Sequence, residues 1–287
     1  YYPADVKRSN LEQAQSHADC EFIQADLLQH DLSELLDGIE WVFHQAGQAG
    51  VRASWGEYFG TYTENNVRAT QLLLEEVRRQ KSVKSFVYAS SSSIYGNAES
   101  FPTSEAILPQ PVSPYGVTKL AGEHLVRLYA SEFEVPTVSL RYFTVYGPRQ
   151  RPDMAFHRFI SAALRGEALT LYGDGEQSRD FTFISDIVQA NISAAECGGK
   201  GEVCNVGGGS RVTVNDVLKI IEEELGRQLI IEREERQHGD ARHTSADVTR
   251  AQKLLNYQPK VTLRTGLQRE LTWLESSGRA NGRAVGG

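Results

Sequence analysis

The 287-residue chain has few cysteines and no long hydrophobic run. Its three cysteines, Cys20, Cys197 and Cys204, are too few and too scattered for a disulfide framework or a zinc site, so we expect them to be reduced. No apolar run approaches the ~18 residues of a membrane span, and the first residues lack the basic and apolar regions of a signal peptide. These absences predict a cytoplasmic protein that does not bind a membrane.

The chain also has fewer positively charged than negatively charged residues. The 30 lysines and arginines are outnumbered by 37 aspartates and glutamates, which gives a net charge of −7. A negative surface disfavours nucleic acid or an anionic membrane as the main partner, because both repel it. It does not exclude a phosphorylated small molecule, since a local cluster of arginines can overcome the overall deficit. The hydrophobic content of 40% and the charged content of 23% are typical of a globular protein.

Short apolar segments alternate with segments of helical periodicity along most of the chain. This alternation predicts βαβ units and therefore an α/β fold with a doubly wound parallel sheet. Ligands of such sheets bind beyond the carboxyl ends of the strands. The predicted strands are 21–25, 41–44, 86–89, 137–142, 181–184, 203–206 and 229–231, and the predicted helices are 6–17, 32–36, 64–79, 115–133, 154–164, 214–225 and 267–274.

The composition changes after Gly147-Pro148, where the basic turn 149–152 begins. We therefore expect a first domain over 1–148 and a smaller C-terminal lobe over 149–275, although the strands near 181–206 could return to the first domain. The last segment, 276–287, is rich in glycine and arginine, and we expect it to be a disordered tail.

A motif that usually opens this kind of fold is missing. A doubly wound dinucleotide-binding domain normally begins with a strand, a GxGxxG turn and a helix, followed about 20 residues later by an acidic residue. Gly47-x-x-Gly50 follows a predicted strand but opens no clear helix. We therefore expect a sheet that is N-terminally incomplete, as though the chain began after a first βαβ unit.

A tyrosine and a lysine stand four residues apart at the start of a predicted helix, in Ser113-Pro114-Tyr115-Gly116-Val117-Thr118-Lys119. This spacing places Tyr115 and Lys119 on one face of the helix, about one turn apart. The ammonium could stabilise a phenolate and lower the tyrosine pKa from its ordinary value of about 10. A tyrosinate near the hydroxyls of Ser90–Ser93 would be a base suited to a sugar hydroxyl. The spacing alone is common in helices, so the surrounding motifs must decide.

Five further stretches accompany this pair in a fixed order. Together they resemble the extended short-chain dehydrogenase/reductase family, specifically its NAD-dependent nucleotide-sugar epimerases and dehydratases, over nearly the whole chain to about Tyr257-Gln258-Pro259. The stretches are Phe43-His44-Gln45-Ala46, Ser90-Ser91-Ser92-Ser93-Ile94-Tyr95-Gly96, Ser113-Pro114-Tyr115-Gly116-x-x-Lys119, Arg141-Tyr142-Phe143-Thr144-Val145-Tyr146-Gly147-Pro148, Ser178-Arg179-Asp180-Phe181 and Asn205-Val206-Gly207.

The resemblance implies a Rossmann-like NAD-binding domain over 1–148, a UDP-sugar-binding lobe over 149–275 and a catalytic role for three residues. Tyr115 would be the base, Lys119 would hold the nicotinamide ribose and lower the tyrosine pKa, and Ser91 would bridge the substrate oxygen and the phenol. In this family NAD accepts and returns a hydride at the sugar. The residues expected to contact NAD are Asp26, Leu27, Ala46, Asn66, Tyr115, Lys119 and Tyr142, although Leu27, Ala46 and Asn66 could instead serve packing or helix capping.

Departures from the family pattern narrow the reaction. Dehydratases carry Asp-Glu after the catalytic serine, and decarboxylases carry a glutamate two places after it, whereas this chain has Ser92 and Ser93. Without an added carboxylate, simple oxidation and return of the hydride is favoured. Thr144 replaces the asparagine of UDP-galactose 4-epimerases, and with the stretch 149–158 it resembles bacterial UDP-glucuronate 4-epimerases.

These resemblances imply a set of substrate contacts. Ser92, Ser93, Thr144 and Arg151 would hold the sugar carboxylate, although Arg151 could instead face a phosphate or the solvent. Arg179 would bind the diphosphate, Tyr172 the uracil and Asp240 the uridine ribose. The alternatives are a solvated surface role for Arg179, core packing for Tyr172 and a surface carboxylate beside a helix for Asp240. The second phosphate arginine of the family is replaced by Gln237.

We therefore expect an isomerase, an NAD-dependent UDP-sugar 4-epimerase that converts UDP-glucuronate to UDP-galacturonate through a 4-keto intermediate. A UDP-glucose or UDP-N-acetylglucosamine 4-epimerase is the alternative enzyme. A truncated, non-catalytic remnant that cannot hold NAD is the alternative of another class. The family usually forms homodimers through two long helices, here 64–79 and 115–133, whose apolar faces could equally belong to the core.

Overall fold

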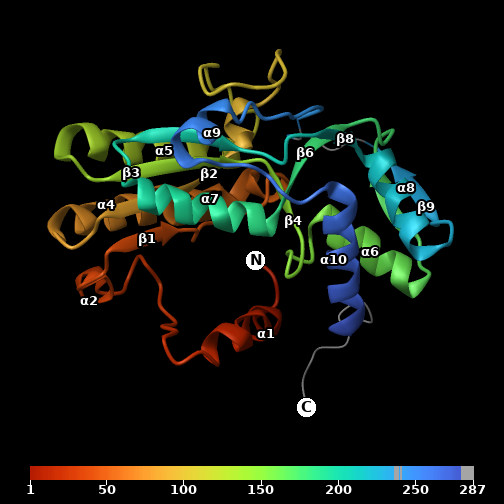
Figure 1. Cartoon of the computed structure of the whole chain (residues 1–287), viewed down its shortest axis with the longest axis horizontal. Coiled ribbons are helices and arrows are strands. Elements are labelled where there is room, and N and C mark those ends of the chain that lie inside the picture. The colour runs from red at the N-terminus through yellow and green to blue at the C-terminus, as the bar shows by residue number, and fades with distance from the viewer. Residues whose placement is uncertain (236–238, 240, 279–287) are drawn as a thin grey trace.

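The computed structural model describes residues 1–235, 239 and 241–278. Its main sheet contains β1 (Trp41–His44), β2 (Ser85–Ser91), β3 (Thr137–Tyr142) and β7 (Glu202–Val206), in the order β1-β2-β3-β7 and all parallel (Figure 1). The predicted α/β fold with a parallel sheet is confirmed. Residues of β2 are buried along the whole strand, as expected for a parallel sheet covered on both faces.

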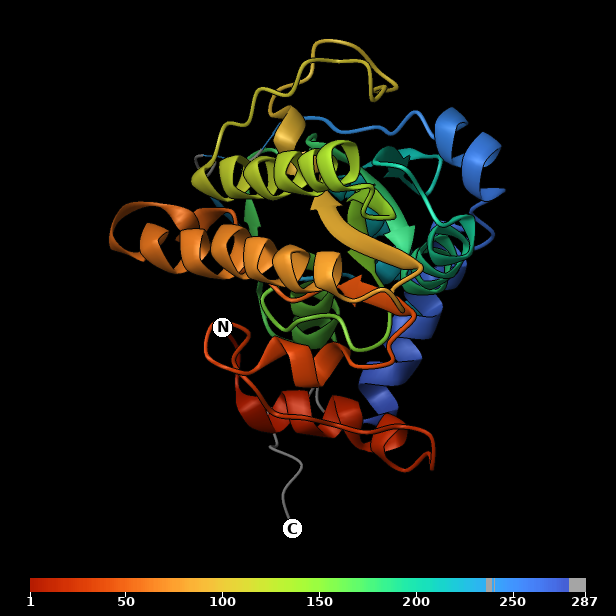
Figure 2. The same ribbon diagram turned by 90° about the vertical axis from the view of Figure 1, so that its left-hand side faces the viewer.

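Alternation along β2 assigns a helix layer to each face of the sheet. Phe86 and Tyr88 pack into a cluster with side chains of α4 (Ala69–Arg79) and α5 (Pro114–Phe133). Val87 points the other way, into a cluster with α7 (Ile184–Cys197) and α9 (Thr249–Leu255). The helices α4 and α5 run side by side (Figure 2). The sheet is thus the middle layer of three.

Helix α5 begins where its sequence predicts. The Ser113 side chain accepts a hydrogen bond of 3.1 Å from the Gly116 amide, and Pro114 occupies the first helical turn. Both residues favour a helix N-terminus at this point, because the serine satisfies an amide that the helix leaves unpaired and proline needs no such partner. The helix start thereby fixes the position of Tyr115.

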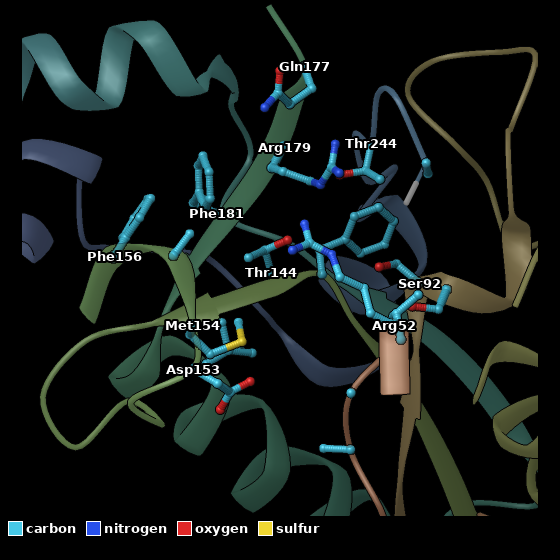
Figure 3. Close-up of a pocket in the computed structure, with 18 of the residues that line it drawn as sticks. Arg52, Ser92, Thr144, Asp153, Met154, Phe156, Gln177, Arg179, Phe181 and Thr244 are labelled. Atoms are coloured by element: carbon cyan, nitrogen blue, oxygen red, sulfur yellow. The ribbon is translucent and has the colours of Figure 1, made fainter. Parts of the chain in front are cut away.

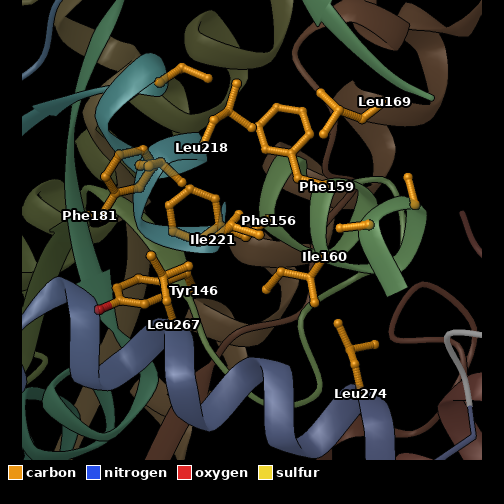
Figure 4. Close-up of a cluster of buried hydrophobic side chains, with 14 of the residues drawn as sticks. Tyr146, Phe156, Phe159, Ile160, Leu169, Phe181, Leu218, Ile221, Leu267 and Leu274 are labelled. Atoms are coloured by element: carbon orange, nitrogen blue, oxygen red, sulfur yellow. The ribbon is translucent and has the colours of Figure 1, made fainter. Parts of the chain in front are cut away.

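A second, smaller group of elements forms the lobe. Its core contains large apolar and aromatic side chains, including Tyr146, Phe156, Ile160, Phe181 and Leu267 (Figure 4). The lobe elements are β4 (Thr144–Tyr146), α6 (Ala155–Arg165), β5 (Leu169–Tyr172), β6 (Ser178–Phe183), β8 (Arg211–Thr213), α8 (Val214–Leu225), β9 (Ile231–Glu234) and α10 (Leu263–Ser276).

The lobe strands form two small sheets. β4 pairs with β6 in parallel and β6 pairs with β8 in an antiparallel ladder, while β5 pairs with β9 in parallel. Between β6 and β8 the chain returns to the main sheet at β7, which pairs with β3. The lobe is therefore joined to the sheet by several crossings of the chain rather than by one linker.

The predicted strand 21–25 is wrong. After α1 (Ala4–Gln15) the chain is irregular until α2 (Leu32–Leu36), and the side chains of Phe22 and Ile23 are 47% and 49% exposed. A strand needs a neighbour for its backbone hydrogen bonds, and residues 21–25 do not pair with β1, the edge strand of the described sheet. The apolar residues are present, but without backbone hydrogen bonds to a neighbouring strand the segment is irregular.

Among the described residues, no helix combines the length and the apolar character that a membrane crossing requires. The predicted disordered tail falls mostly on 279–287, which lie outside the described residues, and helix α10 itself continues to Ser276.

Candidate active site

A cavity of about 900 Å³ lies between the carboxyl ends of the main strands and the lobe (Figure 3). This is the position at which parallel sheets bind ligands, and the volume is in the range of small-molecule sites. Nine of the residues predicted from the sequence line it: Ser91, Ser92, Ser93, Tyr115, Tyr142, Thr144, Arg151, Tyr172 and Arg179.

The serine segment and the tyrosine meet because the backbone can approach closely there. Strand β2 ends at Ser91, whose Oγ accepts a hydrogen bond of 3.1 Å from the Ser93 amide, and a 3-10 turn follows. A Cβ atom added at Gly116 would lie 2.7 Å from the carbonyl oxygen of Ser93. Glycine therefore allows the start of α5 to pack on the serine turn, which places Tyr115 beside Ser91.

The pKa of Tyr115 moves in the opposite direction from the predicted one. Burial raises it, while hydrogen bonding with Ser91 and the positive charge of Arg151 oppose the increase. The positive charge that lowers this pKa in the described structure is that of Arg151, and the predicted lowering by Lys119 stays a prediction. Desolvation of the phenolate outweighs both opposing effects.

Lys119 lies behind the cavity wall rather than in its lining. The residue is 7% exposed, and its Nζ lies 4.6 Å from the centre of the Tyr88 ring. Within the described chain its ammonium makes no hydrogen bond. Burial lowers the pKa of Lys119 to about 8, and the negative charge of Glu123 opposes this decrease. A buried ammonium without an acceptor fits a ligand that brings its own hydroxyl groups.

Asn66 shapes the loop that follows β1. Its side chain accepts from the Gln48 amide at 2.6 Å and donates to the Gln48 carbonyl at 3.1 Å and to Thr118 Oγ1 at 3.0 Å. The residue is buried in a π-helical segment, Thr63–Arg68, a feature frequent at functional sites. Because these bonds occupy the amide, the geometry favours loop support for Asn66 over direct ligand contact.

The other predicted cofactor residues lie in three places. Ala46 is exposed just beyond β1. Asp26 forms a turn by accepting from the Leu28 amide at 3.0 Å, and Leu27 packs partly against the α4–α5 cluster. Asp26 and Leu27 are not brought into the cavity. The hydroxyl of Tyr142 donates a hydrogen bond of 2.8 Å to Asn191, whose role the sequence did not reveal.

A buried ion pair supports the floor of the site. Arg141 donates to both carboxylate oxygens of Glu123, through Nε at 3.0 Å and Nη2 at 2.6 Å. Its Nη1 donates to the Tyr95 hydroxyl at 2.6 Å, and Ser90 Oγ donates to Glu123 at 2.7 Å. Because Ser90 precedes Ser91 on β2, this network fixes the strand end that carries the candidate catalytic serine.

The cavity is strongly positive although the chain is negative. Its described lining contains six arginines and two aspartates, and neither lysine nor glutamate occurs in that described set. The arginines are Arg52, Arg149, Arg151, Arg158, Arg179 and Arg242. Guanidinium groups bind phosphate and carboxylate oxygens in a planar, two-point arrangement. The arrangement is suited to a ligand with several negative charges.

Two arginines flank the predicted aromatic residue. The Arg52 guanidinium lies 4.5 Å and that of Arg158 lies 5.7 Å from the centre of the Tyr172 ring. Arg52 comes from the loop after β1 and Tyr172 from the lobe, so their contact spans the cavity. Arg52 was not predicted from the sequence, since nothing in its spacing marks it, and Arg158 was noted only as part of the stretch 149–158.

The remaining predicted contacts are placed as follows. Arg179 donates to the carbonyls of Ser178 at 3.0 Å and Arg242 at 3.1 Å. Thr144 begins β4 at the cavity wall. Asp240 and Gln237 lie outside the described residues, so their predicted positions have no counterpart here.

Fold and site together define a nucleotide-binding α/β enzyme that places a partly buried tyrosine, a serine and a lysine next to an arginine-lined cavity. The model of the NAD dependent epimerase/dehydratase family matches residues 4–207, and the chain belongs to this family. The predicted family is thereby confirmed.

Relatives and solved structures agree with this assignment. A Bacillus subtilis protein described as an uncharacterized UDP-glucose epimerase, YtcB, is 44% identical over 278 residues, covering 96% of this chain and 86% of the relative. The UDP-glucuronate 4-epimerase of Thermodesulfobacterium geofontis is 35% identical over 277 residues, covering 95% and 84%. The Bacillus cereus UDP-glucuronic acid 4-epimerase, solved with UDP-glucuronic acid and NAD, superposes with a TM-score of 0.92 at 43% identity, covering 96% and 88%.

Proposed function

We propose that this chain catalyses the NAD-dependent 4-epimerisation of UDP-glucuronate and UDP-galacturonate. The observation that carries the proposal is the position of Arg151, which lines the same cavity as Tyr115 and affects its pKa. The names of the relatives support an isomerase acting on UDP-sugars, with NAD as its cofactor. The predicted enzyme class is confirmed at this level.

The described residues fit the nicotinamide end of NAD. Lys119 offers a buried ammonium without an acceptor in the described chain, and Tyr115 stands one helical turn before it. The loop of Ala46 and Gly47, held by Asn66, would border the same ligand. Bound NAD supplies reversible hydride acceptance at the sugar C4.

The protein residues would control the proton and the sugar. Tyr115 would remove the proton from the C4 hydroxyl, and Ser91 would hydrogen-bond to the same oxygen. Desolvation raises the pKa of the Tyr115 phenol, so nearby positive charge is needed to favour the phenolate during proton transfer. Arg151 provides such a charge in the described structure, and Lys119 lies on the same helical face as the tyrosine.

The cavity chemistry favours an acidic sugar. Ser92, Ser93 and Thr144 place small hydroxyl groups in the lining, and Arg151 adds a guanidinium. Together these groups can hold a carboxylate by hydrogen bonds and charge. A 4-keto uronate is a β-keto acid and loses carbon dioxide readily, so firm holding of the carboxylate without an added acid or base would favour return of the hydride.

Other arginines of the cavity would bind the UDP part of the substrate. Arg179 is the first candidate for the diphosphate, and Tyr172, already contacted by Arg52, is the candidate for the uracil. Asp240 remains our proposal for the uridine ribose. We further propose that residues 1–148 hold mainly NAD and that residues 149–275 hold mainly the UDP-sugar, as expected from the sequence.

Turnover of separate UDP-sugars tests the proposal. The protein is incubated with NAD and with UDP-glucuronate, UDP-glucose or UDP-N-acetylglucosamine, and the epimers are separated. We expect UDP-galacturonate from the first; turnover of UDP-glucose without turnover of UDP-glucuronate would refute the choice of substrate. Arg151→Ala should impair turnover of the uronate more than turnover of neutral sugars, since loss of its charge near Tyr115 affects every sugar whereas loss of the carboxylate contact affects only the uronate. Equal losses on both would refute the carboxylate role.

The neutral-sugar alternative has a specific observation in its favour. A solved neighbour, MoeE5, is 44% identical and was crystallised with UDP-glucose and, separately, with UDP-glucuronic acid, each with NAD. The non-catalytic alternative is tested by releasing bound nucleotide from the purified protein and measuring its absorbance. Failure to bind NAD, whether copurified or added, would support that alternative.

We also propose a homodimer and a cytoplasmic location. On α5, Leu128 and Phe133 are 51% and 46% exposed, and Arg78 of α4 lies over the Phe133 ring at 4.0 Å. These groups could pack against the same helices of a second copy, which light scattering would detect as a doubled mass. The three cysteines are free thiols in the described chain, which suits a reducing compartment.

A further inference from the structure

The guanidinium of Arg151 is oriented by a neighbouring carboxylate. Its Nε donates to Asp153 Oδ1 and its Nη2 donates to Asp153 Oδ2, both at 2.9 Å. Nη2 also lies 3.4 Å from the sulfur of Met154. The Arg151 guanidinium further lies 5.1 Å from the centre of the Tyr1 ring, and the Tyr1 hydroxyl donates to Asp153 at 3.4 Å. One edge of the guanidinium is therefore occupied.

The other edge remains available to a ligand. Nη1 of Arg151 makes no hydrogen bond within the described residues, and both Arg151 and Asp153 line the cavity. A two-point contact with Asp153 fixes the plane of a side chain that otherwise samples many rotamers. Since ordering such a chain costs free energy on binding, an arginine already oriented binds its ligand more tightly.

We propose that Asp153 is a positioning residue that directs Nη1 of Arg151 toward the carboxylate of the sugar and so increases the preference for uronates over neutral sugars. This inference rests on the proposed function, because it assumes a substrate with a carboxylate. Asp153 would not bind the sugar itself, because its carboxylate and the sugar carboxylate are both negative. It would act only through Arg151.

Charge repulsion between Asp153 and the sugar carboxylate would change the affinity for UDP-glucuronate in the opposite direction. If Asp153 only added negative charge near the sugar, its removal would strengthen the binding of UDP-glucuronate. If Asp153 orients Arg151, its removal weakens that binding, because the guanidinium must then be ordered by the ligand. The sign of the change in affinity therefore distinguishes the two roles.

The test measures the dissociation constants of UDP-glucuronate and UDP-glucose by calorimetry, with NAD present, for the wild type and Asp153→Asn. Asparagine has nearly the same size but cannot accept from both nitrogens in the same way. We expect about a tenfold weaker binding of UDP-glucuronate and an unchanged affinity for UDP-glucose, in line with the cost of ordering a long side chain on binding. Thermal unfolding checks that the variant is folded.

Asp174 provides a matched control. It lines the same cavity and forms an ion pair of 2.9 Å with Arg242. Asp174→Asn should leave the ratio of the two affinities unchanged. An Asp153→Asn variant with the wild-type ratio, or with tighter binding of UDP-glucuronate, would overturn the inference. A wild type that does not prefer UDP-glucuronate would instead refute the proposed function.

Discussion

Glu270 gives a prediction whose size follows from the structure. The residue is 0% exposed on α10, and its Oε2 accepts a hydrogen bond of 3.0 Å from the Gly147 amide. Its Oε1 is buried and has no partner in the described chain. Gly147 begins the segment that leads to Arg151, so this carboxyl group anchors the loop bearing the proposed specificity residue.

Burial raises the pKa of Glu270 from 4.5 to about 8, with the Gly147 hydrogen bond opposing the increase. Because the folded pKa is the higher one, the associated stability is fully present below about pH 4.5 and is lost as the pH rises to about 8. The difference corresponds to about 5 kcal/mol, at roughly 1.36 kcal/mol for each pH unit. The folded state retains a proton that the unfolded chain releases.

Glu270→Gln should abolish this dependence. Glutamine can still accept from the Gly147 amide, but it never ionises, so no charge is buried at high pH. An unpaired amide group costs about 1–3 kcal/mol. At pH 8 the substitution removes a charge penalty of about 5 kcal/mol and adds an amide penalty of about 1–3 kcal/mol. We therefore expect the variant to be more stable than the wild type by about 2–4 kcal/mol.

Urea unfolding at pH 5, 6, 7 and 8 provides the assay. Between these pH values the wild type takes up about one more proton when folded than when unfolded, and the variant loses this difference. The slope of unfolding free energy against pH should therefore be less negative in the variant, by about 1.36 kcal/mol per pH unit. Glu275→Gln, on the same helix but exposed to solvent, serves as the control and should retain the wild-type slope. An identical slope in wild type and Glu270→Gln would refute the reasoning.

Three further predictions concern the site. Tyr115→Phe should lower kcat by about 10²–10⁴ with little change in KM, as expected for loss of a general base; a kcat near the wild-type value would exclude that role. Glu123→Ala should destabilise the protein by about 3–5 kcal/mol in urea unfolding, because Arg141 stays buried, whereas Glu123→Leu with Arg141→Met should restore much of the loss. Gly116→Ala should lower both kcat and the thermal midpoint, since its Cβ would lie 2.7 Å from the Ser93 carbonyl; an unchanged midpoint would show that the turn can yield.

Much of the fold could be predicted because its signals are local. The apolar runs 86–89 and 137–142 fall within β2 and β3, and the helix expected over 115–133 corresponds to α5. The short strands β4, β5 and β8 were missed, since each depends on a partner from elsewhere in the chain. The strand expected at 21–25 failed for the same reason, because a suitable sequence does not supply a neighbour.

By itself, the sequence determined the spacing of Tyr115 and Lys119, the serine cap before them and the family motifs, because these depend on neighbouring residues and helical geometry. Only the tertiary structure decided that the pKa of Tyr115 rises, that arginines from distant segments converge on one cavity, and that Arg52 reaches Tyr172. Burial and long-range contact set the cost of a charge, and neither can be read from spacing along the chain.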